Sequence, residues 1–150
     1  MNFEQNFNAF NADTNGLSQG SRDIIFVDSG IDNYHGLLKS EGNHEIMLLD
    51  SSRDGIEQIT EALSLRNNLD SIHIFSHGAA GELQLGSSTF SSDNLNSYVD
   101  PITRWRESLS DKADVLLYGC NIAATETGKS FLETISHWSG ADVAASDDIT

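Results

Sequence analysis

Short, continuous apolar runs alternate with segments of helical periodicity from residue 23 onward. The apolar runs predict strands at 24–27, 45–49, 71–76, 113–118 and 141–145. Gly, Ser or Asp follows each run except 71–76, which is followed by His77-Gly78. The 3.6-residue spacing predicts helices at 32–39, 54–63, 93–109 and 125–138. Asp54 is a candidate N-cap, Pro101 is expected to interrupt the third helix, and Gly140 is expected to end the fourth.

This alternation indicates an α/β fold. The strand runs are mainly apolar rather than polar at every second position, which is typical of a parallel sheet covered on both faces. We therefore expect an α/β domain with a mainly parallel central sheet between two layers of helices. Residues 82–85 and 88–90 predict a small β-hairpin around Gly86, after the third strand.

The polar start of the chain predicts two regions. Residues 1–22 are rich in Asn, Gly and Ser and are expected to form a disordered leader. Residues 23–150 are expected to form a single domain, which could continue beyond Thr150. The leader lacks the basic and apolar regions of a signal peptide, and no run is long enough for a membrane helix.

Charge and cysteine content narrow the function. Asp and Glu total 23 against 8 Lys and Arg, a formal net charge of −15. Phosphate backbones and anionic membranes need clustered cations, so neither is an expected partner. Cys120 is the only cysteine, which rules out an internal disulfide and a multi-cysteine zinc site within the chain.

Candidate chemistry collects where the strands end. In open α/β sheets, ligands bind beyond the carboxyl ends of the strands. His77 follows the third predicted strand and Cys120 follows the fourth, and these strands are expected to be neighbours. A cysteine is a good nucleophile as the thiolate, and an adjacent histidine can remove its proton. Gly78 and Gly119 would let backbone approach a substrate, and the Gly78 and Cys120 amides could hold an oxyanion.

The segments around these residues resemble the caspase-like (clan CD) cysteine peptidases. In that group a His-Gly ends the third strand and a cysteine ends the fourth, as His77-Gly78 and Cys120 do here. More closely, the chain is similar to an uncharacterised bacterial domain family. Its members lie near the N-terminus of long secreted proteins with cadherin-like or calcium-binding repeats. The motifs that carry this resemblance are SRDGIEQI (52–59), IHIFSHGAAGELQLG (72–86), LLYGCNIA (116–123) and GADVAASDDIT (140–150).

The resemblance implies a three-layer, flavodoxin-like or caspase-like sandwich with a mainly parallel sheet of strand order 2-1-3-4-5. It implies a cysteine endopeptidase with a His77–Cys120 dyad and no catalytic metal. It also implies a substrate-binding site formed by the end of the first strand and the loop after the fifth. Those positions hold Asp28, Ser146, Asp147 and Asp148. Carboxylates favour a basic residue, Arg or Lys, before the cleaved bond. The expected substrate is a polypeptide, processed in cis within a larger secreted or cell-surface bacterial protein.

Two other interpretations stay open. The domain could be a catalytically silent accessory or anchoring domain of a large adhesin, in which Cys120 is a small buried residue and His77 a turn residue. It could also be a calcium-responsive binding module, because Asp28, Asp50, Asp147 and Asp148 supply oxygen ligands. The two aspartates at 147 and 148 lack the regular spacing of a calcium loop.

Overall fold

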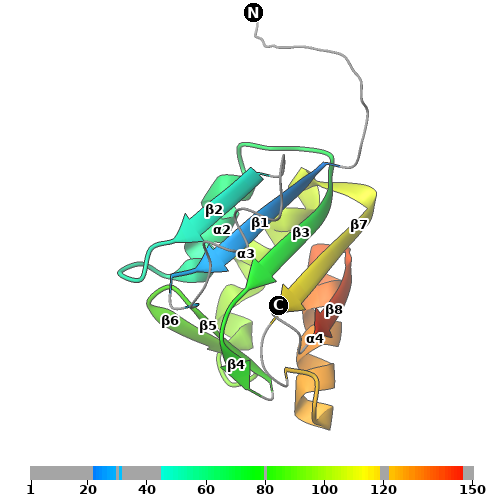
Figure 1. Cartoon of the computed structure of the whole chain (residues 1–150). Coiled ribbons are helices and arrows are strands. Elements are labelled where there is room, and N and C mark those ends of the chain that lie inside the picture. The colour runs from blue at the N-terminus through cyan, green and yellow to red at the C-terminus, as the bar shows by residue number, and fades with distance from the viewer. Residues whose placement is uncertain (1–21, 30, 32–44, 80, 119–121, 147–150) are drawn as a thin grey trace, which may run out of the picture.

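The computed structural model describes residues 22–29, 31, 45–79, 81–118 and 122–146 (Figure 1). The expected leader at 1–22 and the expected helix at 32–39 fall outside these ranges except for Arg22, so both stay predictions. Gly119, Cys120, Asp147 and Asp148 also lie outside the described residues.

A five-stranded parallel sheet forms the centre of the domain. Its strands are β1 (Asp23–Asp28), β2 (Glu45–Leu49), β3 (Leu69–Phe75), β7 (Leu109–Tyr118) and β8 (Asp142–Ser146). Their spatial order is β2-β1-β3-β7-β8, and every neighbouring pair is parallel. The predicted order 2-1-3-4-5 is therefore confirmed. All carboxyl ends lie at one edge of the sheet, as the arrowheads in Figure 1 show.

The described helices cover one face of this sheet. They are α2 (Gly55–Leu63), α3 (Val99–Arg104) and α4 (Glu126–Ser139), with 3-10 turns η1 (Leu95–Tyr98) and η2 (Trp105–Ser108) flanking α3. Alternate strand residues point toward them, because successive side chains of a strand face opposite sides. The resulting core joins strand residues Ile24, Phe26, Ile72, Ile74, Val115 and Leu117 to helix residues Ile56, Ile59, Ile102, Phe131 and Ile135.

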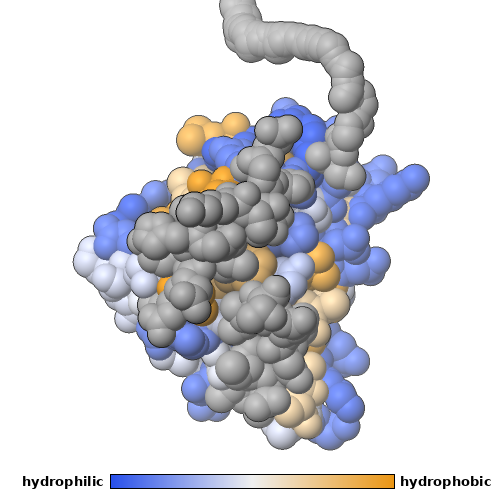
Figure 2. Space-filling model, viewed as in Figure 1, coloured by the Kyte–Doolittle hydropathy of each residue, from blue (hydrophilic) through white to orange (hydrophobic). Residues whose placement is uncertain are grey.

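The opposite face is also apolar where the central strands cross it. Ile25, Val27 and Phe75 are buried there and pack with Tyr118. Figure 2 shows separate hydrophobic patches on this side and hydrophilic residues along much of the outline. Burial on both faces explains why β1 is apolar at successive positions, and it agrees with the predicted three-layer α/β fold.

The expectation of complete burial is wrong for β2. Met47 and Leu48 are 37% and 44% exposed. β2 lies at an edge of the sheet, so it has a neighbouring strand on one side only, and an apolar sequence does not ensure burial there.

The structure also corrects the third predicted helix. The break does not occur at Pro101, which is the third residue of α3. A proline in the first helical turn lacks only an N–H that would have no partner within the helix. The segment instead changes to 3-10 geometry on both sides of α3, at η1 and η2.

A second, three-stranded sheet follows β3. It consists of β4 (Gly78–Ala79), β5 (Glu82–Leu85) and β6 (Ser88–Ser91), in the order β4-β5-β6. The β5–β6 hairpin was predicted and is confirmed, while β4 is too short to predict from a pattern. Because β4 begins three residues after β3 ends, this small sheet lies just beyond the carboxyl end of β3 (Figure 1).

Candidate functional site

The ends of β3 and β7 lie side by side at the carboxyl edge. Phe75 pairs with Tyr118 as the last described pair of the two strands. One residue further, the Ser76 N–H donates to the Tyr118 carbonyl at 2.9 Å. Ser76 and Tyr118, the residues that precede His77 and Gly119 in the sequence, are therefore neighbours at this edge. The side chain of His77 is exposed. Cys120 is not among the described residues.

The backbone of His77 is held by the small sheet. Its carbonyl accepts the N–H of Gln84 at 2.8 Å, which makes His77 and Gln84 a hydrogen-bonded pair of antiparallel strands. Such pairs alternate with non-hydrogen-bonded pairs along an antiparallel ladder. The next pair, Gly78 with Leu83, is therefore a non-hydrogen-bonded pair. In a non-hydrogen-bonded pair the backbone N–H points away from the partner strand, so the Gly78 N–H is directed away from β5.

Glycine at position 78 has a steric reason. A Cβ there would lie 2.7 Å from the Glu82 carbonyl oxygen and 3.2 Å from Ile122. Only glycine lets β4 approach both the β5 backbone and the start of the segment after β7. Packing thus explains the glycine at the end of the sequence IFSHG, independently of any reaction.

Asp28 lies at the end of β1, as predicted, but its side chain is engaged inside the protein. The residue is 4% exposed. Its Oδ1 accepts the N–H of Gly86 at 2.8 Å, which joins β1 to the β5–β6 turn. This hydrogen bond does not favour direct contact between Asp28 and a substrate.

The turn at Gly86 packs against the loop that begins α2. Gly86 has φ +61°, and a Cβ there would clash with the Arg53 carbonyl oxygen and lie 2.9 Å from the Gly55 nitrogen. The Ser87 N–H donates to the Arg53 carbonyl at 2.7 Å. A Cβ at Gly55 would in turn lie 2.5 Å from that of Leu85. Two of the motifs, SRDGIEQI and the end of GELQLG, therefore fit together through their glycines.

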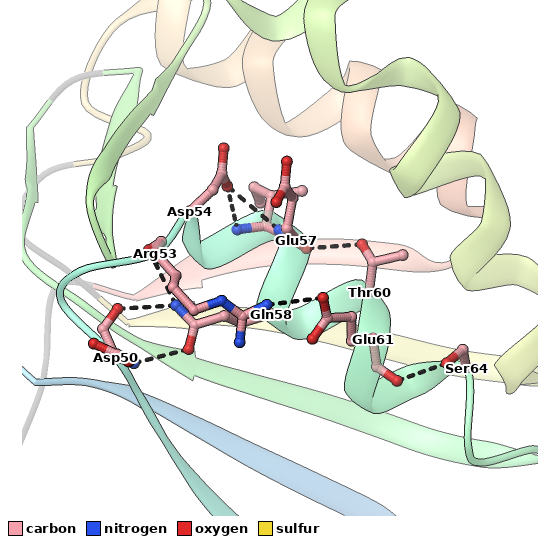
Figure 3. A network of polar contacts seen from close by, with 9 residues as sticks. Asp50, Arg53, Asp54, Glu57, Gln58, Thr60, Glu61 and Ser64 are labelled. Carbon is pink, nitrogen blue, oxygen red and sulfur yellow. Dashed lines mark hydrogen bonds and ion pairs between the residues drawn. The ribbon is translucent and has the colours of Figure 1, made fainter.

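The start of α2 is fixed by a polar network (Figure 3). Asp54 is the N-cap, as predicted, and its Oδ1 accepts the N–H groups of Ile56 and Glu57 at 2.8 and 3.3 Å. Gln58 exchanges hydrogen bonds with the Asp50 backbone and also donates to the Arg53 carbonyl. Most of the motif at 52–59 therefore has a structural role.

The sequence model described as "Domain of unknown function (DUF4347)" matches residues 24–150, which is well over half of the chain. The chain belongs to this family. No curated protein matches it. The match covers every strand of the main sheet, apart from the first residue of β1, and both sides of the carboxyl edge.

Ser76 occupies an unusual position in this DUF4347 domain. It is fully buried, and the described residues offer its Oγ no hydrogen-bond partner. The register of β1 and β3 pairs Val27 with Phe75, so the next residues, Asp28 and Ser76, are cross-strand neighbours. Sequence reasoning gave Ser76 no role, and only its position before His77 could have drawn attention to it.

His73, in β3, is a second polar group of the DUF4347 domain. Its Nδ1 lies 3.1 Å from the Tyr118 hydroxyl, and its Nε2 lies 3.3 Å from Ser71 Oγ and 3.9 Å from Asp23 Oδ2. The Tyr118 ring stacks on Phe75 with centroids 4.2 Å apart. His73 is therefore a histidine whose two ring nitrogens both have polar neighbours on the face of a strand.

The other predicted site residues of the domain are less completely described. Ser146 ends β8 and pairs with Tyr118, so its backbone lies at the carboxyl edge. Gly119, Cys120, Asp147 and Asp148 lie outside the described residues, and their roles stay predictions. No three His, Cys, Asp or Glu side chains gather as metal ligands within the described ranges. The calcium interpretation needs Asp147 and Asp148 and therefore also stays a prediction.

A cavity of the DUF4347 domain lies away from this edge. It has a volume of about 320 Å³, lies between α2 and η2 and is lined by Thr60, Leu63, Arg66, Arg104, Trp105 and Ser108, among others. None of these residues belongs to the carboxyl edge. None of the helices in the described part of the chain is long and apolar enough to cross a membrane.

Proposed function

We propose that this DUF4347 domain is a cysteine endopeptidase whose catalytic residues are His77 and Cys120. The proposed substrate is a polypeptide with Arg or Lys before the cleaved bond, in cis within a larger secreted or cell-surface protein. The proposal uses no metal and no cofactor.

The register of β3 and β7 is the observation that carries the proposal. Each described pair from Ser71 with Asp114 to Phe75 with Tyr118 is separated by 43 positions in the chain. The same 43 positions separate His77 from Cys120. If this register continued for two residues beyond Phe75 and Tyr118, His77 would lie opposite Cys120, the only cysteine of the chain, at the edge where α/β folds bind ligands.

The proposed chemistry follows from this pairing. The His77 imidazole takes the thiol proton, and the Cys120 sulfur attacks the carbonyl carbon of the peptide bond. When the tetrahedral intermediate collapses, the C–N bond breaks and the imidazolium gives its proton to the leaving amine. Water, deprotonated by His77, then hydrolyses the thioester and frees the cysteine.

The orientation of Gly78 supports an oxyanion site. Its N–H is directed away from β5, on the residue directly after His77. A backbone donor in that position costs no reorganisation when negative charge develops on the substrate oxygen. The Cys120 N–H and the close approach that Gly119 permits complete the proposed site.

The preference for a basic residue depends on the end of β8. β7 and β8 are paired with an offset of 28 positions, from Asp114 with Asp142 to Tyr118 with Ser146. If this register continued for two more residues, Asp148 would lie beside Cys120, with Asp147 one residue before it. The formal net charge of −15 would also attract a cationic segment at low ionic strength. Asp28 is not needed as a direct contact.

Alkylation of the single cysteine tests the dyad directly. The full chain is treated with iodoacetamide at neutral pH, and intact mass reports modification of Cys120 alone. We expect His77→Ala to slow alkylation at least about tenfold, because the thiolate fraction falls. His137→Ala is the matched control, since His137 is an exposed histidine on α4.

Peptide cleavage tests the reaction. Fluorogenic peptides with Arg, Lys or Asp before the reporter are incubated with wild type, Cys120→Ala, His77→Ala and His137→Ala. We expect cleavage after Arg and Lys in wild type and His137→Ala only. Alkylation that does not depend on His77, together with no cleavage by wild type, would contradict the proposal and favour the accessory domain.

A further inference from the structure

The buried carboxylate of Asp28 connects the main sheet to the small sheet at the carboxyl edge. Asp28 is almost completely buried, and its Oδ1 accepts the Gly86 N–H at 2.8 Å. The two residues are 58 positions apart in the chain. This bond therefore links the first strand of the main sheet to a turn of the small sheet.

Gly86 has little freedom to move. Its φ of +61° and the missing Cβ let the Arg53 carbonyl and the Gly55 nitrogen lie directly against it. Asp54 forms an isolated β-bridge with Gly86, and Ser87 donates to the Arg53 carbonyl. The Asp28 carboxylate adds a hydrogen bond from the side of β1, so the turn is fixed between β1 and the start of α2.

From this turn, β5 leads directly to His77. Gln84 lies two residues before Gly86, and its N–H donates to the His77 carbonyl at 2.8 Å. Leu83 pairs with Gly78 in the adjacent position. An extended strand of two residues is a short and stiff link, so a displacement of Gly86 is passed to Gln84 and to the backbone of His77.

We infer that Asp28 is a positioning residue for His77, acting through its hydrogen bond to Gly86 and through β5. It sets where His77 and Gly78 lie at the edge, and it does not contact the substrate. The consequence for thiol reactivity rests on the proposed dyad, whereas the placement of His77 does not depend on it.

Substitution by Asn or Ala separates positioning from recognition of a basic substrate. Asp28→Asn keeps an oxygen that can accept the Gly86 N–H but removes the charge. Asp28→Ala removes the acceptor and leaves a buried N–H without its partner. A positioning residue tolerates Asn and not Ala, while a residue that pairs with a cationic substrate tolerates neither.

The experiment compares wild type, Asp28→Asn, Asp28→Ala and the control Asp50→Ala in the full chain. Asp50 is an exposed carboxylate at the end of β2 that accepts hydrogen bonds only from Ser52 among the described contacts. Amide hydrogen exchange of Gly86 and Gln84 and the NMR ring shifts of His77 are measured, together with the pH profile of Cys120 alkylation. If Asp28→Ala does not fold, Asp28→Ser replaces it, because the shorter hydroxyl cannot reach Gly86.

We expect Asp28→Ala to raise exchange at Gly86 and Gln84 at least about tenfold and to move the His77 ring shifts. Asp28→Asn and Asp50→Ala should stay within about twofold of wild type. Unchanged Gln84 exchange and His77 shifts in Asp28→Ala would overturn the inference, and so would equal effects of Asn and Ala. If wild type shows no His77-dependent alkylation, the dyad fails, and exchange and ring shifts still decide the role of Asp28.

Discussion

Gly86→Ala should destabilise the domain far more than a glycine substitution at an ordinary turn. Holding an L-residue at φ +61° costs about 1 kcal/mol. The new Cβ also displaces the Arg53 carbonyl, which accepts hydrogen bonds from Ser87 and from the Gln58 side chain. Weakening these two bonds costs about 1 kcal/mol each, so we expect a loss of about 3 kcal/mol.

Gly140→Ala provides the control. Gly140 follows α4 with φ +74°, so an alanine there has a similar backbone strain. The atom nearest to its Cβ would be a guanidinium nitrogen of Arg106, at 3.0 Å. The Arg106 side chain can move away, which weakens its hydrogen bonds to the Trp138 and His137 carbonyls, so the expected loss is about 2 kcal/mol. Urea denaturation of wild type and both variants measures the free energies of unfolding. Losses that agree within about 0.5 kcal/mol would refute the steric reasoning at Gly86.

Three more predictions concern particular side chains. Ser76→Ala should leave the free energy of unfolding unchanged or raise it, because the described residues give its hydroxyl no partner. Ser108→Ala should lower the free energy of unfolding by about 1 kcal/mol, because its buried hydroxyl donates to a carbonyl of α2. Urea denaturation compares the two, and a larger loss in Ser76→Ala would contradict this. Burial and the hydrogen bond to Asp54 raise the pKa of Tyr98, so its contribution to stability is complete below about pH 10 and is lost as the pH rises further. Tyr98→Phe should reduce this alkaline loss, as measured by thermal unfolding across that range, and an unchanged slope would contradict the assignment. Arg106 donates to the last carbonyls of α4, so Arg106→Met should lower the unfolding free energy by about 1 kcal/mol, and an unchanged urea midpoint would argue that these bonds add nothing.

The local pattern was enough to predict most elements of this domain. Short, mainly apolar runs identified the five parallel strands. β1 is buried at five successive positions, as expected for a strand covered on both faces, whereas β3 and β7 also carry polar residues such as His73 and Asp114. Asp54 and Gly140 marked the ends of their helices, since capping depends on the side chain or φ of one residue. The same reasoning was wrong for the exposure of β2 and for the break near Pro101. Burial depends on the neighbours of a strand, and the effect of a proline depends on its position in the helical turn.

Some features of the candidate site also follow from the sequence, and others do not. The order of the chain already assigns His77 and Cys120 to the ends of neighbouring strands, because a parallel α/β sheet gathers all strand ends at one edge. The role of Asp28 could not be predicted, because the hydrogen bond to Gly86 joins residues that are distant in the chain and meet only after both sheets have formed. Sequence thus specifies which residues can reach the edge. Tertiary packing determines which of them face outward as His77 does and which, like Asp28, hold the edge together, because that depends on contacts between segments with no local signal.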